Sequence, residues 1–185
     1  MVKVILRESE ERMKKALEFV KNEFLRIRTG RASTGLVDNV KIDYYGTPTP
    51  LNQVGNISIP DSQTIAIQPW DKSVISLIER AILNSDLGLN PSNDGNIVRI
   101  PIPPLNEERR KEYVKLAKKV AEEGRISIRN IRRDEIDKLK KTEKEEHISE
   151  DERKHAEVEI QKLTDKYIKE IDNNLISKEK EIMEV

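Results

Sequence analysis

The stretch 103-PPLNEE-108 marks the point at which one kind of sequence gives way to another. It ends a segment that holds all eight prolines, the first of them Pro48 and the last Pro104, and six of the seven glycines. Asn106 is a good helix N-cap, and the two glutamates after it suit the positive end of a helix dipole. A long helix is therefore predicted to begin directly after the last proline.

Charge divides the chain at the same place. Residues 30–104 carry 12 charged side chains out of 75, whereas the 110 flanking residues carry the other 56. The flanks contain no proline and a single glycine, a composition that favours long uninterrupted helices. We therefore place one boundary near Thr29–Gly30 and the other near Pro103–Leu105.

Apolar residues repeat along both flanks with helical spacing. In the first flank the spacings of 7, 4, 3, 4 and 3 resemble a coiled-coil seam formed by Leu6, Met13, Leu17, Val20, Phe24 and Ile27. The helix after Asn106 is predicted to run to about His147, and Ser149 with Glu152 matches a capping box that starts a last helix. That helix carries Ile160, Leu163, Tyr167, Ile171 and Leu175 on one face. Three helices with one apolar stripe each predict a three-helix bundle.

The inserted segment shows strand periodicity instead. Apolar residues alternate at three places, namely Val40 to Tyr44, Ile57 with Ile59, and Ile65 with Ile67. Asp71 can cap a short helix, and Ile97–Ile100 gives a final strand before the proline-rich exit. This pattern predicts a small β/α domain.

Together these patterns predict an α+β protein with two domains. Residues 1–29 and 105–185 form a discontinuous three-helix bundle, and residues 30–104 form the inserted β/α head domain. Two short linkers, near 29–32 and 102–105, connect the domains, and such a pair favours a hinge over a rigid fusion.

Bulk composition excludes several classes of protein. The chain has no cysteine, so disulfides and thiolate chemistry are excluded and zinc would have His and carboxylate ligands alone. In the opening 1-MVKVILRESEER-12 the apolar run is too short for a signal peptide. No run of about 18 apolar residues occurs, so no membrane-spanning helix is predicted. A cytoplasmic, soluble protein is expected. Because 34 basic and 34 acidic side chains cancel, any nucleic-acid contact has to come from local segregation of charge.

Such segregation occurs in 124-GRISIRNIRRDE-135. With about 100° per residue, its four arginines lie within about a 100° sector of a helix. These four, which we call the arginine stripe, are Arg125, Arg129, Arg132 and Arg133. Val120, Gly124, Ile128 and Ile131 occupy the neighbouring sector, which faces the bundle seam.

Two interpretations of the arginine stripe stay open from the residues alone. In the first, the arginines form a solvated face and pair with glutamates of neighbouring helices. In the second, they bind the RNA backbone, because Arg125 and Arg129 have no acid at i±4 and because the planar fork of arginine fits phosphate. Residues 109–133 also carry ten Lys or Arg against three Glu, and Arg26, Arg28 and Arg31 would extend the patch.

An enzyme is the second functional class. The chain lacks a G-x-x-x-x-G-K-[ST] phosphate loop and a cysteine nucleophile. His147, Asp151 and His155 would share one face of a continuous helix and suggest a metal site. A helix that starts at Ser149 leaves His147 outside, so neither an enzyme nor a metal site is predicted.

Three aromatic residues raise the question of base stacking. Strand alternation places Tyr44 in the core and Tyr45 outward at a strand end. Trp70 has staple spacing to Ile75 and is predicted to be a packing residue. A stacking platform is therefore the less favoured interpretation.

Five longer motifs resemble the bacterial ribosome recycling factor family, in the same order and over the full length. They are 28-RTGRAS-33, 43-DYYGTPTPLNQ-53, 85-SDLGLNP-91, 103-PPLNEERR-110 and 125-RISIRNIRRD-134. One departure is the asparagine within the fourth motif, where the family usually has threonine. Both residues cap helices, so the departure leaves the resemblance intact.

The resemblance implies an L-shaped molecule of transfer-RNA dimensions. Its bundle lies against large-subunit ribosomal RNA, and its head is contacted by elongation factor G, which uses GTP to help split the post-termination ribosome. The expected partners are thus the ribosome and elongation factor G, with no DNA, no membrane and no cofactor held by the chain, which is expected to be a monomer. An alternative is a helical RNA-binding or adaptor protein without recycling activity.

Site residues follow from the same resemblance and from the arginine stripe. Arg132 is the best candidate for an essential RNA contact. The other expected rRNA-binding residues are Arg129, Arg133, Arg125, Arg28 and Arg31. The expected hinge residues are Gly30, Arg31, Pro103 and Pro104.

Overall fold

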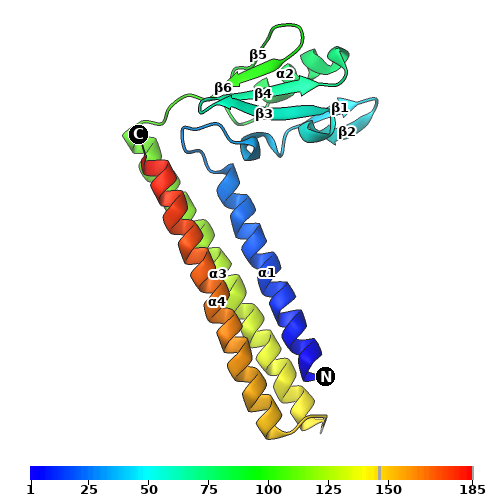
Figure 1. The fold of residues 1–185 in the computed structure, drawn as a ribbon, viewed down its shortest axis with the longest axis vertical. Helices are drawn as coiled ribbons and strands as arrows, with labels where there is room; N and C mark the ends of the chain where they lie inside the picture. Colours follow the sequence, from blue (N-terminus) through cyan, green and yellow to red (C-terminus); the bar gives the residue numbers. More distant parts are fainter. Residues whose placement is uncertain (146, 185) are drawn as a thin grey trace. The chain divides into compact units, whose positions relative to one another are not determined.

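The computed structural model describes residues 1–145 and 147–184, and it consists of long helices and a small β-rich part (Figure 1). The elements in chain order are α1 (Val2–Arg26), η1 (Thr34–Val37), β1 (Lys41–Tyr44), β2 (Thr47–Pro50), η2 (Leu51–Gln53), β3 (Gly55–Asp61), β4 (Thr64–Pro69), η3 (Lys72–Val74), α2 (Ile75–Leu83), β5 (Ser92–Asn93), β6 (Val98–Pro101), α3 (Glu107–Lys144) and α4 (Glu150–Met183).

The chain divides into two compact units. The first unit comprises Met1–Phe24 and Val114–Glu181, and the second comprises Leu25–Tyr113 with the end of the chain from Ile182. Each unit has its own kind of architecture, helical in the first and mixed in the second. The predicted α+β class with two domains is confirmed.

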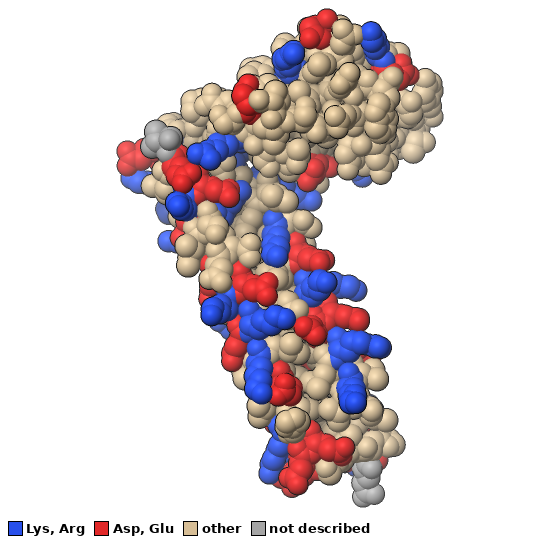
Figure 2. Space-filling view, in the orientation of Figure 1, with Lys and Arg blue, Asp and Glu red and all other residues tan. Residues whose placement is uncertain are grey.

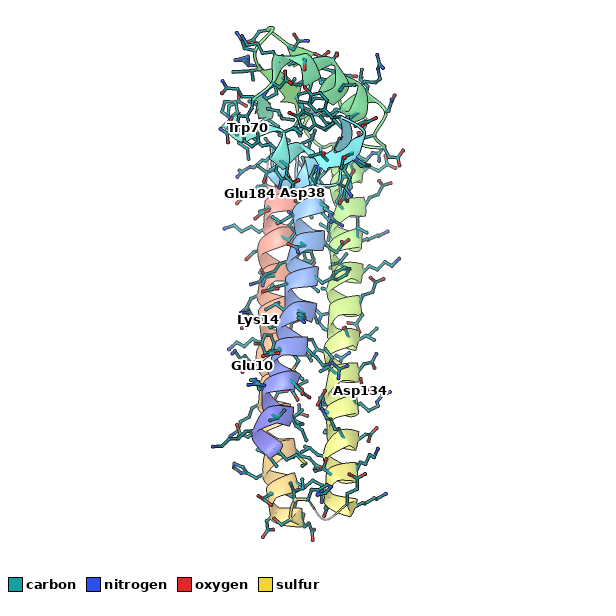
Figure 3. The ribbon with its side chains drawn as sticks, turned by 90° about the vertical axis from the view of Figure 1, so that its right-hand side faces the viewer. Glu10, Lys14, Asp38, Trp70, Asp134 and Glu184 are labelled. Carbon is teal, nitrogen blue, oxygen red and sulfur yellow. The ribbon has the colours of Figure 1, made fainter. Side chains whose placement is uncertain are left out.

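In the first unit, α1, α3 and α4 lie side by side (Figures 1 and 3). Each helix buries one stripe whose members recur every three or four residues, which is the spacing that keeps a helix face turned toward its neighbours. The buried residues of α3 are Ala117, Ala121, Gly124, Ile128, Ile131, Glu135, Leu139 and Thr142. Those of α1 are Ile5, Ser9, Met13, Leu17, Val20 and Phe24.

The start of α1 differs from the prediction. Ile5 is 2% exposed and occupies the seam, whereas Leu6 is half-buried. Ser9 fills the next seam position, because its hydroxyl donates to the carbonyl oxygen of Ile5 at 2.8 Å and so needs no partner on another helix. The predicted seam has no member between Leu6 and Met13, and a buried polar side chain that is satisfied within its own helix fills that place.

Capping side chains fix the starts of α3 and α4 as predicted. The backbone N–H of Arg109 donates to Oδ1 of Asn106 at 2.8 Å. At α4 the N–H of Glu152 donates to Oγ of Ser149 at 3.2 Å, and the N–H of Ser149 donates to Oε2 of Glu152 at 2.8 Å. These bonds satisfy amides that have no partner within the helix. The end of α3 at Lys144 lies slightly before the predicted one.

Loss of the α3 cap is expected to destabilise the protein measurably. We expect Asn106→Ala to lower the free energy of unfolding by about 1 kcal/mol, because the first turn of α3 loses its side-chain acceptor. Urea denaturation followed by circular dichroism measures the change. The control is Asn22→Ala, which removes an exposed asparagine from within α1 and favours the helix slightly. Equal losses in the two variants would contradict the role of the cap.

The second unit is built on antiparallel strands. A four-stranded sheet has the order β3-β4-β6-β5, and β1 and β2 form a separate hairpin. Ile65 pairs with Ile100, and Ile67 pairs with both Ile57 and Val98, so β4 lies between two partners. The predicted strands at Val40–Tyr44, Ile57–Ile59 and Ile65–Ile67 are therefore confirmed.

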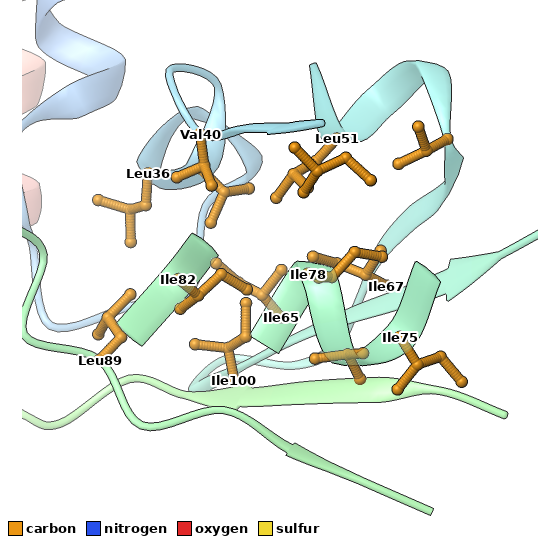
Figure 4. Packing of buried hydrophobic residues seen from close by; sticks show 14 of the residues in the cluster. Leu36, Val40, Leu51, Ile65, Ile67, Ile75, Ile78, Ile82, Leu89 and Ile100 are labelled. Atoms are coloured by element: carbon orange, nitrogen blue, oxygen red, sulfur yellow. The ribbon is translucent and has the colours of Figure 1, made fainter. Parts of the chain in front are cut away.

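An apolar cluster forms a core within the second unit (Figure 4). Side chains from β4, β6 and α2 meet there, and Ile65, Ile78 and Ile100 are fully buried. The short helical segment begins at Asp71, whose carboxylate accepts the backbone N–H of Ser73 at 2.9 Å, as the cap prediction requires. The members of this cluster lie between Leu36 and Ile102, so the β-rich part has an apolar core of its own.

The burial of the two neighbouring tyrosines agrees with the prediction, whereas that of the tryptophan does not. Tyr44 packs against the cluster, whereas Tyr45 is 82% exposed. Trp70 is 73% exposed, so the prediction that it packs through a staple to Ile75 is wrong (Figure 3). Its backbone N–H donates to the carbonyl oxygen of Val54 at 3.2 Å, which holds the main chain at the end of β4 and leaves the indole outside the cluster.

Candidate nucleic-acid interface

Close helix packing supports the arginine stripe on α3. A Cβ atom built on Gly124 would lie 2.4 Å from Cγ2 of Val20 on α1 and 3.2 Å from Cδ1 of Ile171 on α4. The backbone of α3 therefore approaches both neighbours at this point, and no larger residue fits without rearrangement. Ile128 and Ile131, which are also buried, continue the seam and keep the arginine stripe on the flank of the helix.

Arg125 is held between two carboxylates. Its Nη1 lies 2.9 Å from Oε2 of Glu122, and its Nε and Nη2 both lie 2.7 Å from Oδ1 of Asp172 on α4. Burial lowers the pKa of the guanidinium, but the hydrogen bonds to Asp172 and Glu122 outweigh it and the net pKa shift is upward. Arg125 thus joins α3 to α4, and its charge is largely balanced inside the protein.

The expectation that the arginine stripe lacks nearby acids needs correction. Glu122 precedes Arg125 by three residues and also lies 3.4 Å from Nη1 of Arg129. Hydrogen bonding to Arg125 is the main reason why the pKa of Glu122 lies below its usual value, so the carboxylate stays ionised. Acids at i−3 and on α4 therefore supply the partners that a search at i±4 misses.

Arg132 and Arg133 stand in a different environment. Arg132 donates from Nη1 to the amide oxygen of Gln161 on α4 at 3.1 Å, so its acceptor is neutral. Arg133 is exposed, and within the described ranges 1–145 and 147–184 it has no hydrogen-bond or ion-pair partner. Over the same ranges no carboxylate neutralises either guanidinium.

The acids that follow Arg133 in the sequence are directed to α1. Nη2 of Arg12 lies 2.9 Å from Oδ2 of Asp134, and Nη1 of Arg12 lies 2.6 Å from Oε1 of the buried Glu135. Lys138 pairs with Glu8 of α1 in the same way. Asp134 is labelled on α3 in Figure 3. Because these carboxylates bind cations of α1, the charges of Arg132 and Arg133 remain available to an outside anion.

Charges of both signs alternate over the helices on the face shown in Figure 2. Most of the exposed ion pairs on this kind of surface contribute little to stability, since water screens them. The members of the arginine stripe differ from one another in their partners. Arg125 and Arg129 are paired with carboxylates, whereas Arg132 and Arg133 have no carboxylate partner among the described residues.

Arg28 and Arg31 belong to the second unit. Nη2 of Arg31 lies 3.2 Å from Oε2 of Glu184. Arg28 is half-buried and lines a hollow of about 640 Å³ together with Pro103, Pro104, Leu105, Arg109 and Tyr113 among others. The structure thus brings Arg28 close to two of the predicted hinge residues within this unit.

Gly30 has a conformation that glycine adopts readily. Its φ is +78°, and a Cβ built on it would lie 3.3 Å from the backbone nitrogen of Leu105 and 3.7 Å from Cα of Pro104. The two predicted linkers therefore run next to each other in the second unit. A side chain at residue 30 would be strained by the backbone angle and crowded by the second linker.

No metal-binding group is found in the described part of the chain. No three or more His, Cys, Asp or Glu side chains come together there in a way that could hold a metal ion. His147 lies before the cap of α4 at Ser149, as predicted, so it does not continue the helix that carries His155. None of the described helices is long and apolar enough to cross a bilayer.

A family model described as ribosome recycling factor matches residues 20–183. The chain belongs to the ribosome recycling factor family. The family relative from Oleidesulfovibrio alaskensis is 57% identical over 181 residues, which cover 98% of this chain and 98% of the relative. The similarity thus includes the motifs that span the linkers and α3.

Solved structures of the family have the same fold. A solution structure of the ribosome recycling factor is similar with a TM-score of 0.78 at 48% identity, and it covers 100% of this chain and 98% of that one. The T. thermophilus ribosome recycling factor is similar with a TM-score of 0.70 at 48% identity, with 100% of both chains covered. It comes from models that include E. coli elongation factor G bound to the E. coli post-termination complex.

Sequence reasoning found the arginine stripe but missed its partners. Glu122, Asp172, Gln161 and Arg12 were not among the predicted site residues, although they decide which arginines are neutralised. Glu122 was accessible to sequence reasoning through its i−3 spacing to Arg125. The other three lie on α1 and α4, and their pairing depends on how the helices are set against each other.

Proposed function

We propose that the protein is a ribosome recycling factor that binds the post-termination ribosome and, with elongation factor G and GTP, promotes its splitting and release from messenger RNA. The observation that carries this proposal is the match to the family over residues 20–183, with 57% identity to a relative over nearly the whole chain. The association of a similar factor with elongation factor G on a post-termination complex supports the choice of partner.

Arginine contacts to large-subunit ribosomal RNA would anchor the helical part. Arg132 and Arg133 are the principal proposed contacts, because their charges lack carboxylate partners among the described residues. Arg129 follows, since its ion pair with Glu122 is long at 3.4 Å. Each phosphate contact releases counterions from the RNA, so binding should weaken steeply as salt rises.

The remaining basic residues have secondary proposed roles. Arg125 would contribute mainly by joining α3 to α4, because two carboxylates already bind it. Arg28 and Arg31 would contact RNA from the second unit, Arg28 beside the hollow that it lines.

We propose a hinge between the bundle and the head. The bundle comprises residues 1–29 and 105–185, and the head comprises residues 30–104. Such a hinge would let the head move when a partner binds to it and changes position. Gly30, Arg31, Pro103 and Pro104 are the proposed hinge residues. The positive φ of Gly30 and its approach to Leu105 support this assignment, because the two linkers lie next to each other at this residue. An anchored bundle resists displacement while a hinged head moves.

No chemical step is required of the protein itself. Elongation factor G would bind and hydrolyse GTP, and the recycling factor would convert the resulting movement into separation of the subunits. We propose that the chain acts as a monomer in the cytoplasm, without a cofactor of its own and without catalytic residues.

A purified recycling reaction tests the proposal. Post-termination ribosomes are mixed with the protein, elongation factor G and GTP, and the loss of intact ribosomes is followed by light scattering. We expect splitting with all components and none when elongation factor G is left out or GTP is replaced by GDP. Absence of splitting with every component present would favour a helical adaptor that binds ribosomes without recycling them.

A further inference from the structure

The orientation of Arg132 depends on one side chain of α4. Gln161 accepts a hydrogen bond from Nη1 of Arg132 through Oε1 at 3.1 Å. Through its amide nitrogen, Gln161 donates to Oδ1 of Asp165 at 2.9 Å. Because the nitrogen is engaged by a carboxylate one helical turn away, the oxygen is the atom of the amide that faces the arginine. Asp165 therefore sets the direction in which Gln161 presents its acceptor.

Along the arginine stripe, α4 offers acceptors of different charge. Opposite Arg125 it presents the carboxylate of Asp172, at 2.7 Å, and opposite Arg132 it presents the amide of Gln161. A carboxylate neutralises a guanidinium and would compete with a phosphate for it, whereas an amide binds one N–H and leaves the charge in place. Among the described residues the remaining donors of Arg132 have no partner, so they can form the paired contact that suits phosphate.

We propose that Gln161 is a positioning residue that orients Arg132 toward the RNA backbone without neutralising it. The inference rests on the proposed function, since it assumes that Arg132 contacts ribosomal RNA. Arginine loses much side-chain freedom when it binds, and a contact that already restricts it in the free protein reduces that cost. Asp165 completes the arrangement by holding the amide in the required orientation.

Gln161→Glu tests the charge of the acceptor with almost no change in shape. Binding to vacant ribosomes is measured by sedimentation over a series of potassium chloride concentrations. We expect Gln161→Glu to weaken binding about tenfold at low salt and to lower the slope of log affinity against log salt by about one, as if one phosphate contact were lost. Arg132→Ala serves as the reference for that loss.

Gln161→Met tests orientation alone, because it removes the acceptor and keeps the length and the neutral charge. We expect affinity to fall by about two- to threefold with an unchanged salt slope, since the charge of Arg132 remains but its side chain is free to move. The exposed position of Gln161 on α4 leaves both variants able to fold, which the helical circular dichroism signal verifies. If Gln161 had only a structural role, the salt slope would be the same for the wild type, Gln161→Glu and Gln161→Met.

A double variant separates this inference from the proposed function. In an Arg132→Ala background, Gln161→Glu should cause no further loss, because its effect passes through Arg132. If Arg132→Ala weakens binding and Gln161→Glu does not, Gln161 has no positioning role and the RNA contact of Arg132 stands. If Arg132→Ala leaves binding unchanged, the RNA contact and the positioning role both fail.

Discussion

Arg132→Ala is expected to reduce binding of the protein to vacant ribosomes by about 10- to 100-fold at low salt, which corresponds to the loss of a hydrogen-bonded contact to a charged group. The salt slope should fall by about one, and recycling at limiting concentrations of the protein should fall in proportion. The reason is that Arg132 presents an oriented guanidinium whose described partner is the neutral amide of Gln161. Sedimentation with ribosomes and the splitting reaction measure the two effects.

Arg7→Ala is the matched control for that experiment. Arg7 lies on α1, its side chain is 72% exposed and it forms a long ion pair of 3.9 Å with Glu11. The control removes the same side chain and the same charge from the same compact unit, but from outside the arginine stripe. Equal losses for the two variants would mean that net charge and not the position of Arg132 governs binding, and the site would then be wrong while family membership stands.

Gly124→Val is expected to destabilise the first unit by about 1–3 kcal/mol, the range for overpacking a closely packed core. The added Cβ would lie 2.4 Å from Cγ2 of Val20, and the two methyl groups have no space between α1 and α4. Urea denaturation followed by circular dichroism measures the loss.

Two further variants show whether the loss comes from crowding. Ser127→Val places the same residue at an exposed position of α3, where the intrinsic helix preference alone should change stability by a few tenths of a kcal/mol. Val20→Ala opens space opposite Gly124, so Gly124→Val should cost less in that background than in the wild type. Additive losses would show that Gly124 and Val20 do not meet as described.

Much of the fold was predictable because it depends on local chemistry. Asn106 and Ser149 cap α3 and α4 where the sequence placed those starts, since a capping side chain acts within three residues of itself. Alternation in β1 and β4 likewise reflects the two faces of a strand. The place of Ser9 in the seam was not predictable from hydrophobicity, because a hydroxyl bonded to its own helix behaves as a seam residue.

The candidate site was predictable only as a set of arginines on one side of a helix. Their pairing depends on Asp172 and Gln161, which lie 47 and 29 residues from Arg125 and Arg132 in the sequence. Which of them meets which arginine follows from the alignment of α3 with α4, and helical periodicity contains no information about that alignment. The prediction that Trp70 packs against Ile75 was wrong for a similar reason. Staple spacing describes neighbours in the sequence and contains no information about the space beside β4.

The first compact unit combines Met1–Phe24 with Val114–Glu181, a segment that is synthesised much later. A ribosome that adds about 5–20 residues per second makes α1 roughly 5–20 s before it reaches the partner helix segments that begin at Val114. The apolar cluster of the second unit, from Leu36 to Ile102, is complete earlier. During its own translation the protein therefore forms its β-rich part first. Until the C-terminal helices are made, α1 is an amphipathic helix without partners. Chaperones or neighbouring nascent chains can bind its apolar face during this time.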